Sequence, residues 1–318
     1  MVPCWYSRQR INRGHRSLTR SWISGGKPGR APSATPKPRA ASHARCARLT
    51  CGASIMPWAT PSPATRPVTS NLLPMSSLAE RIDQARVELS SWRCFAAEAL
   101  LRWRHPTLGM VMPAEFIPLI EMTGLVREMT NWVLSRALAQ LAKWHSEGLR
   151  LQICVNVSSR NLEEPDFVTR LADLLELNRI EPKFLELEFS DEHNFGNIAA
   201  VHKHLHDLRG LGVSIAIDDF GAGTNGFASI ENLAADVIKL DRRLIRAMLD
   251  SPRQQAVVQT IIDMGHRLGM KVVAEGLENP ATLKLLHGWG CEAAQGFLIN
   301  RPMPAETFAE WLGRKFIA

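Results

Sequence analysis

Short apolar runs recur along most of this chain, and each of them ends in a polar or charged residue. The runs span residues 94–98, 151–156, 184–188, 213–219, 236–239, 271–275 and 292–295. Their last residues are Glu98, Asn156, Glu188, Asp218 with Asp219, Lys239, Glu275 and Gln295. The intervening segments are long enough for helices, and alternating strands and helices predict a parallel sheet. Seven or eight repeats in about 240 residues predict an α/β fold. We expect a closed (β/α)8 barrel of the TIM type, with functional groups at the C-terminal ends of the strands.

The run VSIAIDD, residues 213–219, ends in two adjacent carboxylates, Asp218 and Asp219. Like charges repel, and each carboxylate needs a partner or water once it is partly buried. A divalent-metal site uses paired acids at a strand end, because one carboxylate can bridge two ions while its neighbour completes a coordination shell. The structural alternative is that one Asp only caps the following helix.

The charge of the chain is divided unevenly. The net charge is +7, but residues 1–79 hold 12 of the 38 Lys and Arg residues and no Asp or Glu. The remainder has 26 basic against 31 acidic residues, so a nucleic acid polymer is not an expected partner of the folded part. Residues 1–74 also hold 10 of the 19 prolines and show no apolar periodicity. We therefore expect residues 1–75 to be a disordered, basic, low-complexity extension and residues 76–318 to form the barrel domain.

Two other interpretations of the extension stay open. It could be a basic arm for nucleic acid or an anionic membrane. It could also be translated from upstream of the true start, with Met56 and Met75 as internal starts. No apolar run approaches the roughly 18 residues of a membrane span. Cys94, Cys154 and Cys291 lie within apolar runs, so we expect buried thiols in a reducing, cytoplasmic compartment.

The residues at the ends of the runs form a consistent donor set. They are hard oxygen donors and one amine, which favours Mg²⁺ or Mn²⁺ over Zn²⁺. A two-ion site of this kind suits phosphodiester hydrolysis, because the ions lower the pKa of a water and stabilise charge on phosphoryl oxygens. Arg102 shares a face with Glu98 by period-two counting and could clamp a phosphate. For Lys239 alone, a structural ion pair remains the alternative.

The same residues lie in motifs of a known family. Residues 98–103 read EALLRW and are followed by HP, LG and FIPLIE. Further along the chain come VNVS, LELE, IAIDDFGAG, DVIKLD, VVAEGLE and QGFLINRP, in the family order. Over about residues 84–318 the chain resembles the EAL domain family. The resemblance implies an EAL barrel that hydrolyses cyclic di-GMP to linear pGpG.

Motif positions imply a role for each residue of the candidate site. The implied ligands of a first ion are Glu98, Asn156, Glu188 and Asp218. The implied ligands of a second ion are Asp218, Asp219 and Glu275. Lys239 would orient the attacking water with support from Glu275. The implied substrate and active-site contacts are Leu100, Arg102 and Gln295.

Three departures from the family pattern predict reduced activity. Asp191 stands where the family has a Glu that braces the loop after the fifth strand. That loop, residues 220–227, has lost the family's Thr, Tyr and two Ser residues in favour of Ala222, Thr224, Asn225 and Gly226. The YQP strand before the EAL motif appears only as DQA, residues 83–85, which predicts a damaged first strand.

These departures leave two function classes open. The first is a cyclic di-GMP phosphodiesterase of reduced activity. The alternative is a catalytically weak or inactive EAL domain that acts as a cyclic di-GMP receptor or a protein-interaction module. In the family the loop after the fifth strand also forms a dimer contact, so a homodimer through this loop is expected.

Overall fold

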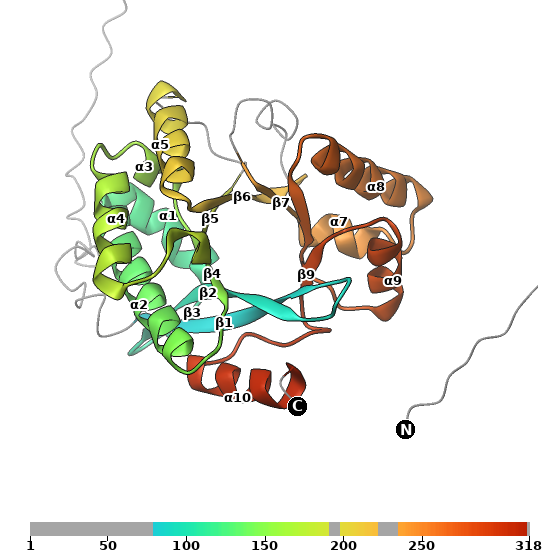
Figure 1. Ribbon diagram of the computed structural model, residues 1–318, viewed down its shortest axis with the longest axis horizontal. Helices are drawn as coiled ribbons and strands as arrows, with labels where there is room; N and C mark the ends of the chain where they lie inside the picture. Colours follow the sequence, from blue (N-terminus) through green and yellow to red (C-terminus); the bar gives the residue numbers. More distant parts are fainter. Residues whose placement is uncertain (1–78, 191–197, 222–234, 317–318) are drawn as a thin grey trace, which may run out of the picture. The chain divides into compact units, whose positions relative to one another are not determined.

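The computed structural model describes residues 79–190, 198–221 and 235–316, which form a closed barrel with helices around it (Figure 1). Asp191, residues 222–226 and the basic N-terminal segment lie outside the described residues. The strands are β1 (Ala79–Glu88), β2 (Cys94–His105), β3 (Gly109–Val111), β4 (Gln152–Asn156), β5 (Leu185–Ser190), β6 (Ser214–Phe220), β7 (Val237–Leu240), β8 (Lys271–Ala274) and β9 (Ala293–Gln295). The helices are α1 (Pro113–Thr123), α2 (Val126–Ser146), α3 (Ser159–Leu162), α4 (Phe167–Asn178), η3 (Pro182–Phe184), α5 (Ile198–Leu211), α7 (Arg242–Ala247), α8 (Pro252–Arg267), α9 (Pro280–Gly288) and α10 (Ala305–Phe316).

Strand β1 closes the barrel. Strands β2, β4, β5, β6, β7, β8 and β9 follow one another as parallel neighbours. Strand β1 lies between β9 and β2 and is antiparallel to both, and β3 extends β2 as a hairpin outside the ring. The link between β1 and β2, residues 89–93, is too short for the crossover helix that a parallel pair needs. The predicted (β/α)8 barrel is confirmed, with one antiparallel strand in the ring.

The prediction of a damaged first strand is wrong. Strand β1 pairs with β2 from Ala79 opposite Trp103 to Val87 opposite Cys94, and its end also pairs with β9. Strand pairing depends on backbone hydrogen bonds, which DQA makes as readily as YQP. The N–H of Ala85 donates to Oδ1 of Asn300 at 3.0 Å, a bond that proline at this position could not make.

Local signals set the ends of the helices. Gly124, in the left-handed conformation with φ of 76°, ends α1 and separates it from α2. Asp241, Ser251 and Asn279 precede α7, α8 and α9, and the side chain of each accepts a hydrogen bond from a backbone N–H of the first turn.

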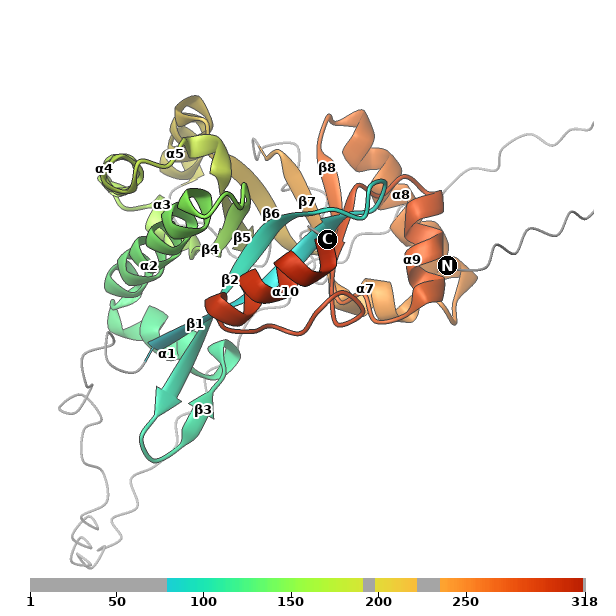
Figure 2. The same ribbon diagram turned by 60° about the horizontal axis from the view of Figure 1, so that its bottom comes forward.

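The main core lies between the strands and the helices that surround them. Helix α2 contributes Leu138 and Leu141, both fully buried, and α10 lies against β1 (Figure 2).

Cys94, Cys154 and Cys291 are buried and form no disulfide with one another, as expected. Within the described ranges, every helix is too short or too polar to cross a membrane.

Candidate active site

Alternation along the strands points the functional side chains into the barrel. A small apolar cluster of Ala216, Val237, Val273 and Ala293 precedes Asp218, Lys239, Glu275 and Gln295 by two positions each. Residues two apart on a strand share a face, so this layer supports the polar layer above it. Above the polar layer lies a cavity of about 680 Å³. Glu98, Asn156, Asp219, Glu275 and Gln295 line it.

The predicted residues come together, although not all lie at strand ends. Asn156 and Gln295 end β4 and β9, and Glu275 follows β8 directly. Glu98 lies in the middle of β2, because β2 continues past it to pair with β1 and β3. Glu188 lies two residues before the end of β5.

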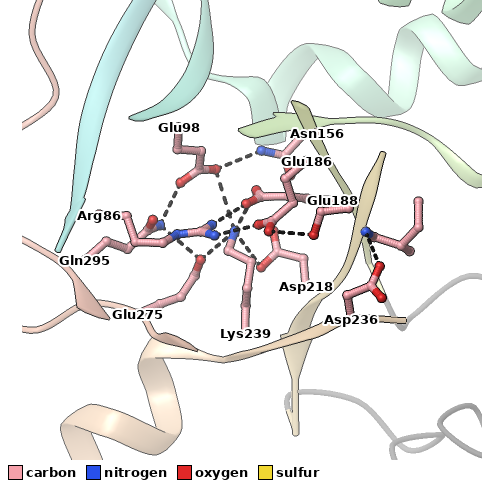
Figure 3. A network of polar contacts seen from close by, with 12 residues as sticks. Arg86, Glu98, Asn156, Glu186, Glu188, Asp218, Asp236, Lys239, Glu275 and Gln295 are labelled. Atoms are coloured by element: carbon pink, nitrogen blue, oxygen red, sulfur yellow. Dashed lines mark hydrogen bonds and ion pairs between the residues drawn. The ribbon is translucent and has the colours of Figure 1, made fainter. Parts of the chain in front are cut away.

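Lys239 is the centre of the polar layer (Figure 3). Its side chain is fully buried, and its Nζ lies 2.7 Å from Glu188 Oε2 and 2.7 Å from Glu275 Oε1. Asp218 Oδ1 is 3.0 Å away and Glu98 Oε1 is 3.8 Å away. Four carboxylates therefore surround one ammonium group, which holds them close together despite their mutual repulsion.

Two amide side chains fix the orientation of Glu98. Asn156 Nδ2 donates to Glu98 Oε1 at 2.8 Å, and Gln295 Nε2 donates to Glu98 Oε2 at 2.6 Å. The same Nε2 lies 3.0 Å from Glu275 Oε1 and links the two carboxylates. Asn156 uses its NH₂ group for Glu98, so its Oδ1 is the atom that it can offer to a cation.

The pKa values reflect burial and crowding of negative charge. Burial opposes the charged form of Lys239, but the carboxylates around it raise the pKa of its ammonium well above the usual value. Burial also opposes ionisation of Glu98, but Lys239 and the two amide donors hold its pKa below the usual value. Burial, together with the neighbouring Asp218, raises the pKa of Glu275 to about 8. With all four carboxylates ionised, the layer would carry more negative charge than Lys239 balances, a condition that a bound divalent cation would relieve.

Asp219 has an unusual backbone. Its φ of 53° places it in the left-handed region, which few non-glycine residues adopt. The register between β6 and β7 shifts between Ile217 and Phe220, around this residue. Burial and the nearby carboxylates of Asp218 and Asp241 raise the pKa of Asp219 to about 6. Strained conformations of this kind persist where the surrounding structure holds them, often at functional sites.

The donor geometry fits divalent cations. Glu98, Glu188 and Asp218 each place an oxygen within 4.8 Å of the others, and so do Asp218, Asp219 and Glu275. The two clusters share Asp218, so one carboxylate can serve both. All these donors are carboxylate oxygens, the ligand type that Mg²⁺ and Mn²⁺ prefer.

The predicted substrate contacts differ in placement. Leu100 and Gln295 line the cavity. Arg102 lies on the same strand as Glu98, and its Nη1 donates to the carbonyl of Leu101 at 2.7 Å. It is partly buried and is not among the residues that line the cavity.

Sequence reasoning missed Arg86 and Glu186. Both are almost fully buried inside the barrel, and Arg86 contacts both Glu186 and Glu188 (Figure 3). The available signal was Leu185-Glu186-Leu187-Glu188, in which two carboxylates share one face of a strand and so need a cation between them. Arg86 carried no signal of its own.

Known proteins resemble this chain in sequence and in structure. A cyclic di-GMP phosphodiesterase of Pseudomonas aeruginosa, PA2567, is 42% identical over 231 residues, which are 73% of this chain and 39% of that protein. This chain thus spans about two fifths of the length of that relative. The structure of the PaMucR phosphodiesterase in complex with c-di-GMP is 34% identical, with a TM-score of 0.69 over 73% of this chain and 95% of that one. The EAL enzyme Bd1971, bound to cAMP and cyclic-di-GMP, is 29% identical, with a TM-score of 0.71 over 74% and 65%. The family model of the EAL domain matches residues 84–302, and with the barrel and its carboxylate layer this places the chain in the EAL domain family.

Proposed function

We propose that this chain is a metal-dependent phosphodiesterase that hydrolyses cyclic di-GMP to linear pGpG. The observation that carries the proposal is the pair of oxygen clusters that share Asp218. Three of their members, Glu98, Asp219 and Glu275, line the cavity. The name of the PA2567 relative and the ligand of the PaMucR structure support the same substrate.

The carboxylate layer would hold two divalent ions, Mg²⁺ or Mn²⁺. The proposed ligands of the first are Glu98, Asn156, Glu188 and Asp218. The proposed ligands of the second are Asp218, Asp219 and Glu275. Divalent ions bound there lower the pKa of a water and stabilise negative charge on phosphoryl oxygens.

Lys239 and Glu275 would position the attacking water. The ammonium of Lys239 donates hydrogen bonds in fixed directions, because its contacts with Glu188 and Glu275 hold it in place. Glu275 lies next to the ammonium of Lys239 and would offer the water an acceptor oxygen.

The cavity offers the two kinds of contact that a cyclic dinucleotide needs. Its lining includes the apolar residues Leu101, Ile117 and Val133, which can contact a purine ring. Arg242 and Arg246 of α7 line the cavity as well and can compensate phosphate charge. The further proposed substrate contacts are Leu100, Arg102 and Gln295.

A receptor role without turnover is the second candidate, because the sequence departs from the family both in loop 220–227 and at Asp191, the residue expected to brace that loop. In that case cyclic di-GMP binds and is not hydrolysed. We also propose a domain boundary near residue 76, a homodimer through the same loop, and a cytoplasmic location.

Product analysis tests the proposal. Purified protein is incubated with cyclic di-GMP and Mg²⁺ or Mn²⁺, and the nucleotides are separated by chromatography. We expect pGpG with either ion, and none with EDTA or with Ca²⁺, which is larger and activates water poorly. Glu98→Ala and Asp218→Ala should abolish hydrolysis while circular dichroism stays unchanged.

Asp207→Ala provides the matched control, because it removes an exposed carboxylate on α5. It should hydrolyse at the wild-type rate. Full activity in EDTA or in either active-site variant contradicts the proposed site. Cyclic di-GMP binding without pGpG formation supports the receptor role instead.

A further inference from the structure

Arg86 is a buried cation beneath the carboxylate layer. It lies on β1, and its side chain is 1% exposed. Its Nη1 donates to Glu186 Oε1 at 2.5 Å, and its Nη2 donates to Glu188 Oε1 at 2.6 Å. The guanidinium therefore forks between two carboxylates of β5 (Figure 3).

This fork leaves Glu188 little freedom. Glu188 Oε1 accepts from Arg86, and Oε2 accepts from Lys239 Nζ at 2.7 Å. Glu186, the other end of the fork, accepts from Ser214 Oγ at 3.1 Å. The fork is thus anchored on β5 and β6, and both oxygens of Glu188 are held in fixed directions.

Stability alone does not explain why Arg86 and Glu186 are buried inside the barrel. Replacement of a buried ion pair by apolar residues of similar volume is often neutral or stabilising. Two methionines at positions 86 and 186 could therefore give the protein about the same stability as the ion pair. What apolar residues cannot supply is a directed hydrogen bond to Glu188.

We propose that Arg86 is a positioning residue, which fixes the carboxylate of Glu188 for a divalent cation and is itself held by Glu186. The proposal rests on the proposed function, since it concerns the first-ion cluster of Glu98, Glu188 and Asp218. Hydrogen-bond partners of metal ligands orient them and tune affinity.

The test uses two variants that keep the net charge of the barrel interior. Arg86→Met combined with Glu186→Met removes the fork and both its charges together. Arg86→Lys keeps the positive charge but cannot donate to both carboxylates in a planar fork. Mn²⁺ binding is measured by titration calorimetry without nucleotide, and thermal unfolding checks the fold.

Loss of a hydrogen-bond partner of this kind typically weakens metal affinity by about 10–100-fold, and we expect this for the double variant. Arg86→Lys should weaken Mn²⁺ binding as well, to a smaller extent. The matched control is Arg81→Met with Asp83→Asn, which removes another buried pair of β1. Arg81 and Asp83 face away from the barrel interior by strand alternation, so Mn²⁺ affinity should stay at the wild-type value.

Two outcomes overturn the proposal, and they are distinguishable. Wild-type affinity for Mn²⁺ in both charge-conserving variants shows that Arg86 does not position Glu188, while the proposed metal site stands. Absence of Mn²⁺ binding by the wild-type protein overturns the metal site itself, and the positioning role with it.

Discussion

Replacement of Lys239 by methionine tests how far the carboxylate layer depends on its one central ammonium. Lys239 is fully buried, and its Nζ has contacts of 2.7 Å with both Glu188 and Glu275. At an effective dielectric constant of about 20, each such contact is worth about 6 kcal/mol before the cost of desolvation. After desolvation, removal of one partner of a buried ion pair costs about 3–5 kcal/mol. For a domain of this size, that corresponds to a fall in Tm of roughly 6–20 °C.

Divalent cations should reverse part of this loss. The interior of Lys239→Met is more negative by one charge, so we expect Mn²⁺ to raise its Tm by more than it raises that of the wild-type protein. Hydrolysis should nevertheless fall about 10²–10⁴-fold, because the ammonium that helps to orient the attacking water is lost. Thermal unfolding by circular dichroism, in EDTA and in Mn²⁺, measures the first effect, and product chromatography measures the second.

Lys203→Met on α5 is the matched control. Its Nζ also lies 2.7 Å from a carboxylate, that of Asp207, but its side chain is 71% exposed. An exposed pair contributes at most about 1 kcal/mol, so the Tm should change little. The reasoning is refuted if Lys239→Met unfolds at the wild-type temperature in EDTA. It is also refuted if Mn²⁺ raises the Tm of Lys239→Met and that of the wild-type protein equally.

Three further predictions concern other parts of the chain. Burial raises the pKa of Asp83 to about 7, so the folded protein keeps a proton there that the unfolded chain loses above about pH 4. The stability that this group contributes is fully present below about pH 4 and is lost as pH rises through 7. The free energy of unfolding, measured with urea, should therefore depend less on pH in Asp83→Asn than in the wild type. Limited proteolysis followed by mass spectrometry should give a stable fragment that begins near residues 75–85, and a resistant N-terminal segment would contradict the predicted extension. Restoration of the family residues at position 191 and in loop 220–227 should raise kcat more than the affinity for cyclic di-GMP, because a misplacement of about 1 Å can cost on the order of 10²-fold in rate. A wild-type kcat equal to that of the restored variant would show that these residues do not limit hydrolysis. The substitutions for that restoration are Asp191→Glu, Thr224→Tyr, Asn225→Ser and Gly226→Ser.

The sequence determined the fold and most of the candidate site. Each short apolar run ends in its functional group, and parallel strands bring their C-terminal ends to the same side of a barrel. Lys239 and Glu275 could therefore be expected near one another from local pattern alone. The same reasoning failed for Glu98, which lies inside β2, because antiparallel pairing with β1 and β3 lengthens that strand beyond its apolar run.

Only the tertiary structure decided how the barrel closes and what lies beneath its carboxylates. The departure of residues 83–85 from YQP predicted a damaged strand β1. The pairing of β1 depends instead on backbone groups and on the side chain of Asn300, which is far away in sequence. Arg86 pairs with Glu186 and Glu188, about 100 positions further along the chain. No local pattern encodes that contact, because it depends on the register at which β1 enters the ring between β9 and β2. The charge balance of the site is therefore a property of the closed barrel and cannot be obtained from any single segment of the sequence.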